Sequence, residues 1–287
     1  MRRRFAWPGA DPREIMALRA PHRPAATDMP DKTKYIVGTS GYSFDDWVGE
    51  FYPPGTRKQD MLDEYARHFS AVELNFSYYR MPAAGTLDRI ARRVPEGFTF
   101  WIKANRKTTH EQDRSVAGEF LESLAPLGES GKLAGVLLQF PQSFHRTVAD
   151  RKYLAATLED FASAPLAVEF RHRSWDHPST VEGLGSRGVT LVIPDVPDLE
   201  GLYRPAAPVL TSAVGYLRLH SRDAGKWYAG ASERYDYDYS QDELRALLGE
   251  WSAVERQAGR IYAFFNNCHR GQAARNAEAF RRLIEQI

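Results

Sequence analysis

Short apolar runs alternate with amphipathic stretches from Lys34 to the end of the chain. The apolar runs cover residues 35–40, 71–76, 98–104, 135–140, 166–171, 189–195, 214–220 and 260–266. Several are almost continuously apolar, which is typical of parallel strands covered on both faces. Amphipathic stretches that predict helices lie at 58–69, 84–94, 115–130, 150–162, 179–187, 240–258 and 272–286. The sixth apolar run has no such partner, because a proline-rich stretch at 196–212 predicts a long loop there.

This alternation predicts an α/β fold with a parallel sheet, and eight strands predict its closure into a (β/α)8 TIM barrel. The alternative is an open doubly wound sheet, but no Gly-x-Gly-x-x-Gly follows an early strand. We therefore expect one domain over residues 34–287, an eight-stranded parallel TIM barrel with an irregular loop in place of the sixth helix.

The first 33 residues have a different character from the rest of the chain. They are rich in Arg, Pro and Ala and show no sustained periodicity, so we expect residues 1–33 to form a poorly ordered N-terminal extension. Met29 lies just before the first apolar run, and an upstream start-codon error is therefore a further hypothesis.

Charge and composition exclude several broad functions. The net charge is +1, and without the basic first 34 residues the remainder carries 30 Lys and Arg against 33 Asp and Glu, a net charge of −3. We therefore expect no extended nucleic-acid contact. No apolar run approaches the roughly 20 residues of a membrane helix, so we expect no membrane association. The lone Cys268 precludes an internal disulfide, and with no secretory signal it fits a cytoplasmic protein.

Every predicted strand ends in polar or ionisable residues. In TIM barrels the carboxyl ends of the strands carry the active site. Polar loops after strands are ordinary, but polar residues at all eight strand ends, some of them inside the strands, predict a functional cluster. These residues are Thr39, Ser40, Glu73, Asn75, Lys103, Gln139, Glu169, Arg171, Asp195, Arg218, His220, Asn266 and Asn267.

Three strands carry two polar residues spaced two positions apart, which places both on one face. A layer of salt bridges in the barrel core and a set of charges converging on a substrate are both consistent with this spacing. The pairs are Glu73 with Asn75, Glu169 with Arg171, and Arg218 with His220.

Lys103 ends a strand that is rich in Phe and Trp. Such a lysine can hold an anion, donate a proton or form a Schiff base, and pairing with Glu73 or Gln139 is the structural alternative. Aromatic residues also crowd the loops after the strands, where they either roof the core or cover a substrate. They include Tyr42, Tyr78, Trp175, Trp227 and Tyr228.

A metal site is conceivable at the same face, because the carboxylates and histidines there suffice as ligands for Zn²⁺, Mn²⁺ or Mg²⁺. Lys103, Arg171 and Arg218 would share that space and neutralise the carboxylates, and no His-x-His or His-Glu-x-x-His spacing occurs. We expect no metal and no cofactor. The candidate ligands are Glu73, Glu169, Asp195, His110 and His220.

Six runs of the chain resemble, in the same order, the family called domain of unknown function 72. They are VGTSGYSFDDWVGEFYPPG, FSAVELNFSYYRMP, FTFWIKANRKTTH, GVLLQFP, VEFRHRSW and YAFFNNCHRGQAARNA, from about Tyr35 to the carboxyl end. The resemblance implies a TIM barrel and no established reaction. It also implies that His110 and Asn276 belong to the characteristic polar positions, together with the strand-end residues named above. The family usually has Arg-x-His-Gly after strand seven, whereas this chain has Ser221, so a different loop shape is expected there.

We therefore expect an enzyme, a hydrolase, lyase or isomerase, that acts on a small anionic substrate, hydroxyl-rich or phosphorylated, by metal-free acid–base chemistry. A metal-dependent hydrolase or isomerase similar to the barrels of endonuclease IV or xylose isomerase is one alternative, and a non-catalytic ligand-binding module is another. The catalytic candidates are Glu169, Glu73, His220, Lys103 and Asp195. The substrate-binding candidates are Thr39, Ser40, Tyr42, Asn75, His110, Gln139, Arg171, Trp175, Arg218, Tyr228, Asn266 and Asn267.

Overall fold

Eight parallel strands close into a barrel in the computed structural model, which describes residues 32–286. Each strand pairs with the next along the chain, and the last pairs with the first. The predicted TIM barrel and its eight strands are confirmed. The strands are β1 (Tyr35–Ser40), β2 (Ala71–Leu74), β3 (Thr99–Lys103), β4 (Leu133–Gln139), β5 (Leu166–Glu169), β6 (Thr190–Asp195), β7 (Val214–Leu219) and β8 (Arg260–Phe265).

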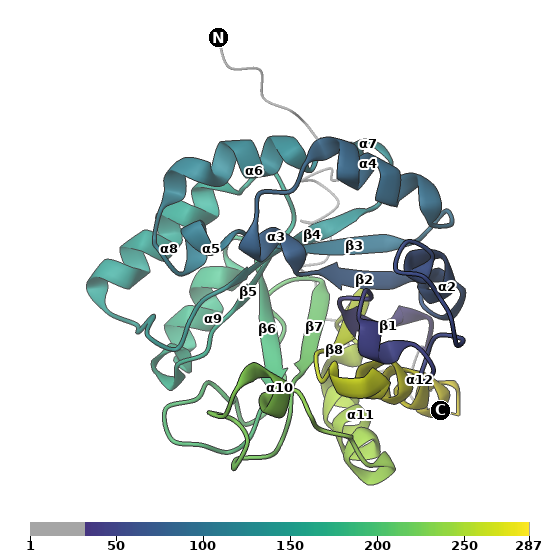
Figure 1. Ribbon diagram of the computed structural model, residues 1–287. Helices are drawn as coiled ribbons and strands as arrows, with labels where there is room; N and C mark the ends of the chain where they lie inside the picture. Colours follow the sequence, from purple (N-terminus) through teal and green to yellow (C-terminus); the bar gives the residue numbers. More distant parts are fainter. Residues whose placement is uncertain (1–31, 287) are drawn as a thin grey trace.

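Helices surround the ring of strands (Figure 1). The α-helices are α2 (Met61–His68), α3 (Phe76–Tyr79), α4 (Ala84–Arg93), α5 (Arg106–Thr109), α6 (Ala117–Ser123), α7 (Ala125–Glu129), α8 (Val148–Asp160), α9 (Pro178–Gly185), α10 (Ala231–Arg234), α11 (Gln241–Glu255) and α12 (Gln272–Glu285). The 3-10 helices are η1 (Lys32–Lys34), η2 (Asp45–Trp47), η3 (Arg114–Val116), η4 (Arg173–Trp175) and η5 (His269–Gly271).

The helices predicted from the sequence are all present, with one divided. The stretch predicted over 115–130 forms η3, α6 and α7, with a break at Leu124. Pro126 lies in the first turn of α7, and its missing N–H and its ring prevent α6 from continuing through this position. The predicted strand over 71–76 ends earlier, at Leu74, because α3 begins at Phe76.

The connection between β6 and β7 contains no helix over residues 196–213, all of which are described. The predicted irregular loop is therefore confirmed. The loop is nevertheless tied to the barrel, because the Thr211 hydroxyl accepts a hydrogen bond from the Leu191 N–H at 2.7 Å and donates one to the Val189 carbonyl at 2.6 Å. It also forms an isolated antiparallel bridge between Leu202 and His172.

Two apolar cores hold the barrel together, one on each side of the sheet. The larger lies between the strands and the helices, and the smaller fills the lumen. Gly38 lets β1 and β2 approach each other closely, because a Cβ there would lie 2.3 Å from the Ala71 carbonyl oxygen. That space admits Tyr65 of α2, whose hydroxyl donates to the Ala71 carbonyl and accepts from the Thr39 N–H. Helix α2 is thereby fixed against the β1–β2 edge.

The predicted extension over residues 1–33 lies outside the described residues except for Lys32 and Thr33, which begin η1. Met29 and the start-codon hypothesis also lie outside them. Within residues 32–286 the helices are too short or too polar for any of them to cross a membrane.

Candidate functional site

A polar layer covers the apolar filling of the lumen. The lower lumen holds Ala71, Trp101, Leu137, Ala167, Tyr216 and Phe264. Because side chains alternate along a strand, the residues two positions further on also face inward, at the carboxyl ends of the strands. The polar lumen cluster, as we call it, consists of Ser40, Glu73, Lys103, Gln139, Glu169, Arg171, Arg218, His220 and Asn266.

Arg218 joins two carboxylates from opposite parts of the barrel. Its Nε lies 2.9 Å from Glu73 Oε2 and its Nη2 lies 2.7 Å from Glu73 Oε1, which makes a bidentate pair. Its Nη1 donates to Glu169 Oε2. Tyr216 donates a further hydrogen bond of 2.6 Å to Glu73. All four side chains are buried, so each charge is compensated by a partner rather than by water.

Arg171 and His220 continue this network toward the mouth of the barrel. Arg171 Nε lies 2.5 Å from Glu169 Oε1, and Arg171 Nη2 lies 3.2 Å from His220 Nε2. The other ring nitrogen of His220 is bonded to the Asn266 amide at 2.9 Å. Burial, reinforced by the charge of Arg171, lowers the pKa of His220 to about 3, so the ring is neutral at neutral pH. The two arginines hold the pKa of Glu169 well below its usual range against the opposing effect of burial.

Lys103 is the cation of this cluster that has no carboxylate partner. Its Nζ makes neither a hydrogen bond nor an ion pair with any of residues 32–286, and lies over the Tyr78 ring, 4.3 Å from the centroid. Its predicted structural pairing with Glu73 or Gln139 is therefore absent from the described part of the chain. Burial and the charge of Arg218 lower the pKa of Lys103 from 10.5 to about 7, although Glu169 and Glu73 oppose this shift.

Polar groups without a hydrogen-bond partner among the described residues lie near the mouth of the barrel. The buried Ser40 Oγ and Asn75 Oδ1 have no hydrogen-bond partner among the described residues. His110, at the end of α5, packs edge-on against Tyr78 with ring centroids 5.0 Å apart. Burial and then the charge of Lys103 lower the pKa of His110 to about 4, so this ring is also neutral. Gln139 donates to the Phe140 carbonyl.

Trp227 covers the cluster from the loop that follows β7. It is buried, its ring lies edge-on to His220 at 6.2 Å, and the guanidinium carbons of Arg171 and Arg234 lie 5.7 and 5.3 Å from its centroid. Arg234 also donates to the Trp227 carbonyl. Trp227 and Tyr78 were noted in the sequence only as two of many aromatic residues, and Tyr216 was not singled out at all. Its position two residues before Arg218 was the available signal.

Three of the predicted site residues point out of the lumen. Thr39 contacts Tyr65 of α2, Asp195 accepts hydrogen bonds from Arg222 and Tyr239, and Asn267 donates to Asn276 of α12. Each lies one position away from an inward-facing residue, so the alternation of the strand turns it toward the helices. These residues fix loops and helices to the barrel and are separate from the polar lumen cluster.

The three aromatic residues among the substrate-binding candidates also lie outside the polar lumen cluster. Trp175 is buried in the outer core, stacked on Phe170 at 4.2 Å, and its Nε1 donates to the Phe144 carbonyl. Tyr42 packs against Tyr65 of α2, with ring centroids 6.1 Å apart. Tyr228 is 60% exposed and bonds Gln142. Of these substrate-binding candidates, Trp175 belongs to the outer core and the partly buried Tyr42 packs against it.

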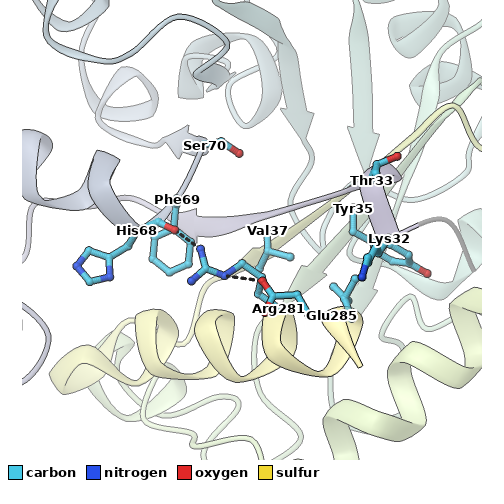
Figure 2. Close-up of a pocket in the computed structure, with 10 residues that line it drawn as sticks. Lys32, Thr33, Tyr35, Val37, His68, Phe69, Ser70, Arg281 and Glu285 are labelled. Atoms are coloured by element: carbon cyan, nitrogen blue, oxygen red, sulfur yellow. Dashed lines mark hydrogen bonds and ion pairs between the residues drawn. The ribbon is translucent and has the colours of Figure 1, made fainter. Parts of the chain in front are cut away.

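A separate hollow of about 240 Å³ lies between β1, the end of α2 and the end of α12 (Figure 2). Arg281 crosses it, donating to the His68 carbonyl and pairing with Glu285 at 3.8 Å. Arg281 and Glu285 thus pair with one another across this hollow, whereas Lys103 has no carboxylate partner. As for metals, residues 32–286 contain no group of three or more His, Cys, Asp or Glu side chains placed to bind an ion.

Comparisons with known proteins give a consistent family assignment. The family model "Protein of unknown function DUF72" matches residues 36–287. The UPF0759 protein YunF of Bacillus subtilis (strain 168) is 29% identical over 268 residues, which is 87% of this chain and 94% of that protein. A DUF72 family protein of Thermotoga maritima MSB8 has a crystal structure that is similar with a TM-score of 0.81 at 38% identity, over 88% of this chain and 99% of that one. One from Enterococcus faecalis V583 gives a TM-score of 0.77 at 28% identity, over 88% and 95% of the two chains.

Proposed function

The chain belongs to the DUF72 family of proteins of unknown function, and for this member we propose an enzyme that acts on a small anionic substrate. The substrate, hydroxyl-rich or phosphorylated, binds at the carboxyl face of the barrel. The chemistry is acid–base catalysis in which Lys103 gains and loses the proton. This proposal keeps the site expected from the sequence and changes which residue acts in it.

The charge balance of the polar lumen cluster carries this proposal. Arg218 is shared between Glu73 and Glu169, and Arg171 pairs with Glu169 as well. Both carboxylates are therefore engaged, and a protonated Lys103 leaves the cluster with one uncompensated positive charge. A partly buried charge of this kind is costly unless a partner arrives. A substrate anion supplies that partner.

Lys103 is better suited to proton transfer than the carboxylates. A general acid or base works best when its pKa lies near the operating pH. The lowered pKa of Lys103, about 7, meets that condition. Glu169 has a pKa well below its usual range and is a weak base, while His220, with a pKa of about 3, does not become protonated at neutral pH. We assign Glu169 and Glu73 the role of positioning Arg171 and Arg218.

Neutral groups around Lys103 suit a hydroxyl-rich or phosphorylated substrate. Ser40 and Asn75 offer buried oxygens without partners, and His110 is a neutral ring beside Tyr78. Hydrogen bonds to such groups become available when a ligand replaces water at the mouth, since an unpaired buried polar atom gains most from a new partner. Trp227 packs against His220 and Arg171 at the same face of the barrel.

Sulfate binding to the full-length protein tests the proposal, because the charge of sulfate is constant between pH 6 and 9. Isothermal titration should show affinity that falls above pH 7, by up to about tenfold per pH unit, as Lys103 loses its proton. Lys103→Met should bind weakly at every pH, and Lys107→Met, which changes an exposed lysine nearby, should behave as wild type. Affinity that stays constant with pH in the wild-type protein contradicts the proposal.

Native mass spectrometry with elemental analysis, on protein purified without chelator, provides a second readout. A retained anionic metabolite that is lost in Lys103→Met supports the proposal and names compounds to assay. Zinc or manganese near one per chain favours the metal-dependent hydrolase or isomerase instead. A tightly bound metabolite that is recovered unchanged after prolonged incubation favours a non-catalytic binding module.

A further inference from the structure

We propose that the Lys103 amine forms an imine with a small anionic carbonyl compound, a 2-oxo acid or a phosphorylated aldehyde or ketone. This inference rests on the proposed function and names the substrate class for the same site. It assigns Lys103 a covalent role in addition to proton transfer.

The first observation is the freedom of the Lys103 side chain. A lysine that serves only structure is expected to pair with a carboxylate, and two carboxylates lie in the same polar lumen cluster. Both are held by Arg218 and Arg171 instead. The Nζ of Lys103 lies over the face of Tyr78, and no hydrogen bond with residues 32–286 occupies its lone pair when the amine is neutral.

The second observation is the positive surroundings of the amine. Only a neutral amine attacks a carbonyl, and neighbouring cations together with burial are a known means of keeping a lysine neutral. Arg218 and Arg171 both act on Lys103 in this sense, and the pKa of about 7 leaves roughly half of the amine neutral at neutral pH. A surface lysine is neutral in only about one molecule in a thousand or fewer at that pH.

The third observation explains why the carbonyl compound should be an anion. Arg171 is the cluster's arginine nearest to solvent, with 14% of its side chain exposed against 2% for Arg218. A carboxylate or phosphate placed against Arg171 forms a charge-assisted hydrogen bond and holds the rest of the molecule at the mouth. A neutral aldehyde gains no such interaction.

The chemistry balances with groups that are present. The amine nitrogen forms a bond to the carbonyl carbon, and the carbonyl oxygen becomes the hydroxyl of a carbinolamine. The C–O bond then breaks, and the oxygen leaves as water with the two hydrogens that the amine nitrogen gives up. His110, a neutral ring whose Nδ1 is bonded to the Thr109 hydroxyl, packs against the same Tyr78 ring as Lys103 and offers a hydrogen-bonding group to the carbinolamine.

Reductive trapping tests the imine directly. The full-length protein is incubated at pH 7 with glyoxylate, a small anionic aldehyde, and sodium cyanoborohydride, and the modified residue is located by peptide mass spectrometry. We expect one modification per chain, at Lys103, formed at least about tenfold faster than at Lys107. Sulfate should slow it, and propanal, a neutral aldehyde of similar size, should modify Lys103 more slowly than glyoxylate does. Lys103→Arg should lose the label, and Lys107→Arg should keep it.

Two results would overturn the inference. One is a label that is spread over exposed lysines with no preference for Lys103. The other is modification of Lys103 at equal rates by glyoxylate and propanal, which removes the anion from the argument. If sulfate affinity still falls above pH 7 in the same protein, the proposed acid–base function survives and only the imine is refuted.

Discussion

Replacing Lys103 with methionine should stabilise the protein, and the gain should shrink as the pH rises. Lys103 has a folded-state pKa below that of an unfolded lysine, so the unfolded chain binds the proton more tightly. Between the two pKa values the unfolded state carries more bound protons, and the stability of the wild-type protein therefore rises with pH through that window. Methionine has no proton to bind and removes this dependence.

The size of the effect follows from the shift. A drop from 10.5 to about 7, at 1.36 kcal/mol for each pH unit, is a penalty of at most about 5 kcal/mol below pH 7. At pH 9 the folded lysine is neutral and the unfolded lysine is still protonated, but the pH is only about 1.5 units below the unfolded pKa of 10.5. The penalty therefore falls to about 2 kcal/mol. The stabilisation of Lys103→Met relative to wild type should therefore decrease by about 3 kcal/mol between pH 6 and 9.

Urea unfolding of both proteins at pH 6, 7, 8 and 9 measures this difference. All other titrating groups are shared, so their effects cancel when the two unfolding free energies are subtracted. Lys107→Met is the matched control, and its difference from wild type should stay flat with pH. Parallel pH curves for wild type and Lys103→Met would refute the lowered pKa of Lys103 and, with it, the electrostatic argument for the site.

Three further predictions concern the charges of this site and the packing of the barrel. Arg218→Met leaves two buried carboxylates short of a partner and should cost about 3–5 kcal/mol in urea unfolding; an unchanged midpoint would contradict the charge assignment. The His220 ring should show neutral NMR signals from pH 8 to 5, because its pKa is lowered to about 3, and an imidazolium signal at pH 6 would be incompatible with this. Since only the unfolded chain then takes up this proton, His220 should lower stability as the pH falls from about 6.5 toward 3. Gly38→Ala should destabilise by several kcal/mol, since its Cβ would meet the Ala71 carbonyl, whereas Gly85→Ala in α4 meets no atom within 4 Å and should stabilise by about 0.5–1 kcal/mol in thermal unfolding.

The sequence was sufficient for the architecture because the apolar runs and amphipathic stretches are distinct. It also placed Glu73 with Asn75, Glu169 with Arg171, and Arg218 with His220 on common faces of their strands, because a spacing of two along a strand fixes a common face. The missing sixth helix was readable from prolines that remove backbone donors. These predictions depend only on local order along the chain.

Other features depend on contacts between distant strands and were not readable. Asp195 ends β6 and Asn267 follows β8 by two residues, and both strands are apolar on both faces, so the pattern did not show to which side these residues point. Its position at a strand end made Glu169 a reasonable general base. The structure pairs it with Arg218, which lies 49 residues further along the chain, and the sequence pattern does not show this contact. Trp175 follows a strand as a substrate-covering residue would, but its partners Phe144 and Phe170 make it part of the outer core.

The arginine that links Glu73 and Glu169 also has a consequence for the order of folding. Glu73 lies in β2, Glu169 in β5 and Arg218 in β7, so the bridge spans 145 residues of chain. During synthesis both carboxylates emerge before the guanidinium that neutralises them. A partial barrel that lacks β7 would have to bury Glu73 without its arginine partner, and it therefore gains little by closing early. Collapse of the lumen is expected to be a late and cooperative event, governed by the arrival of β7.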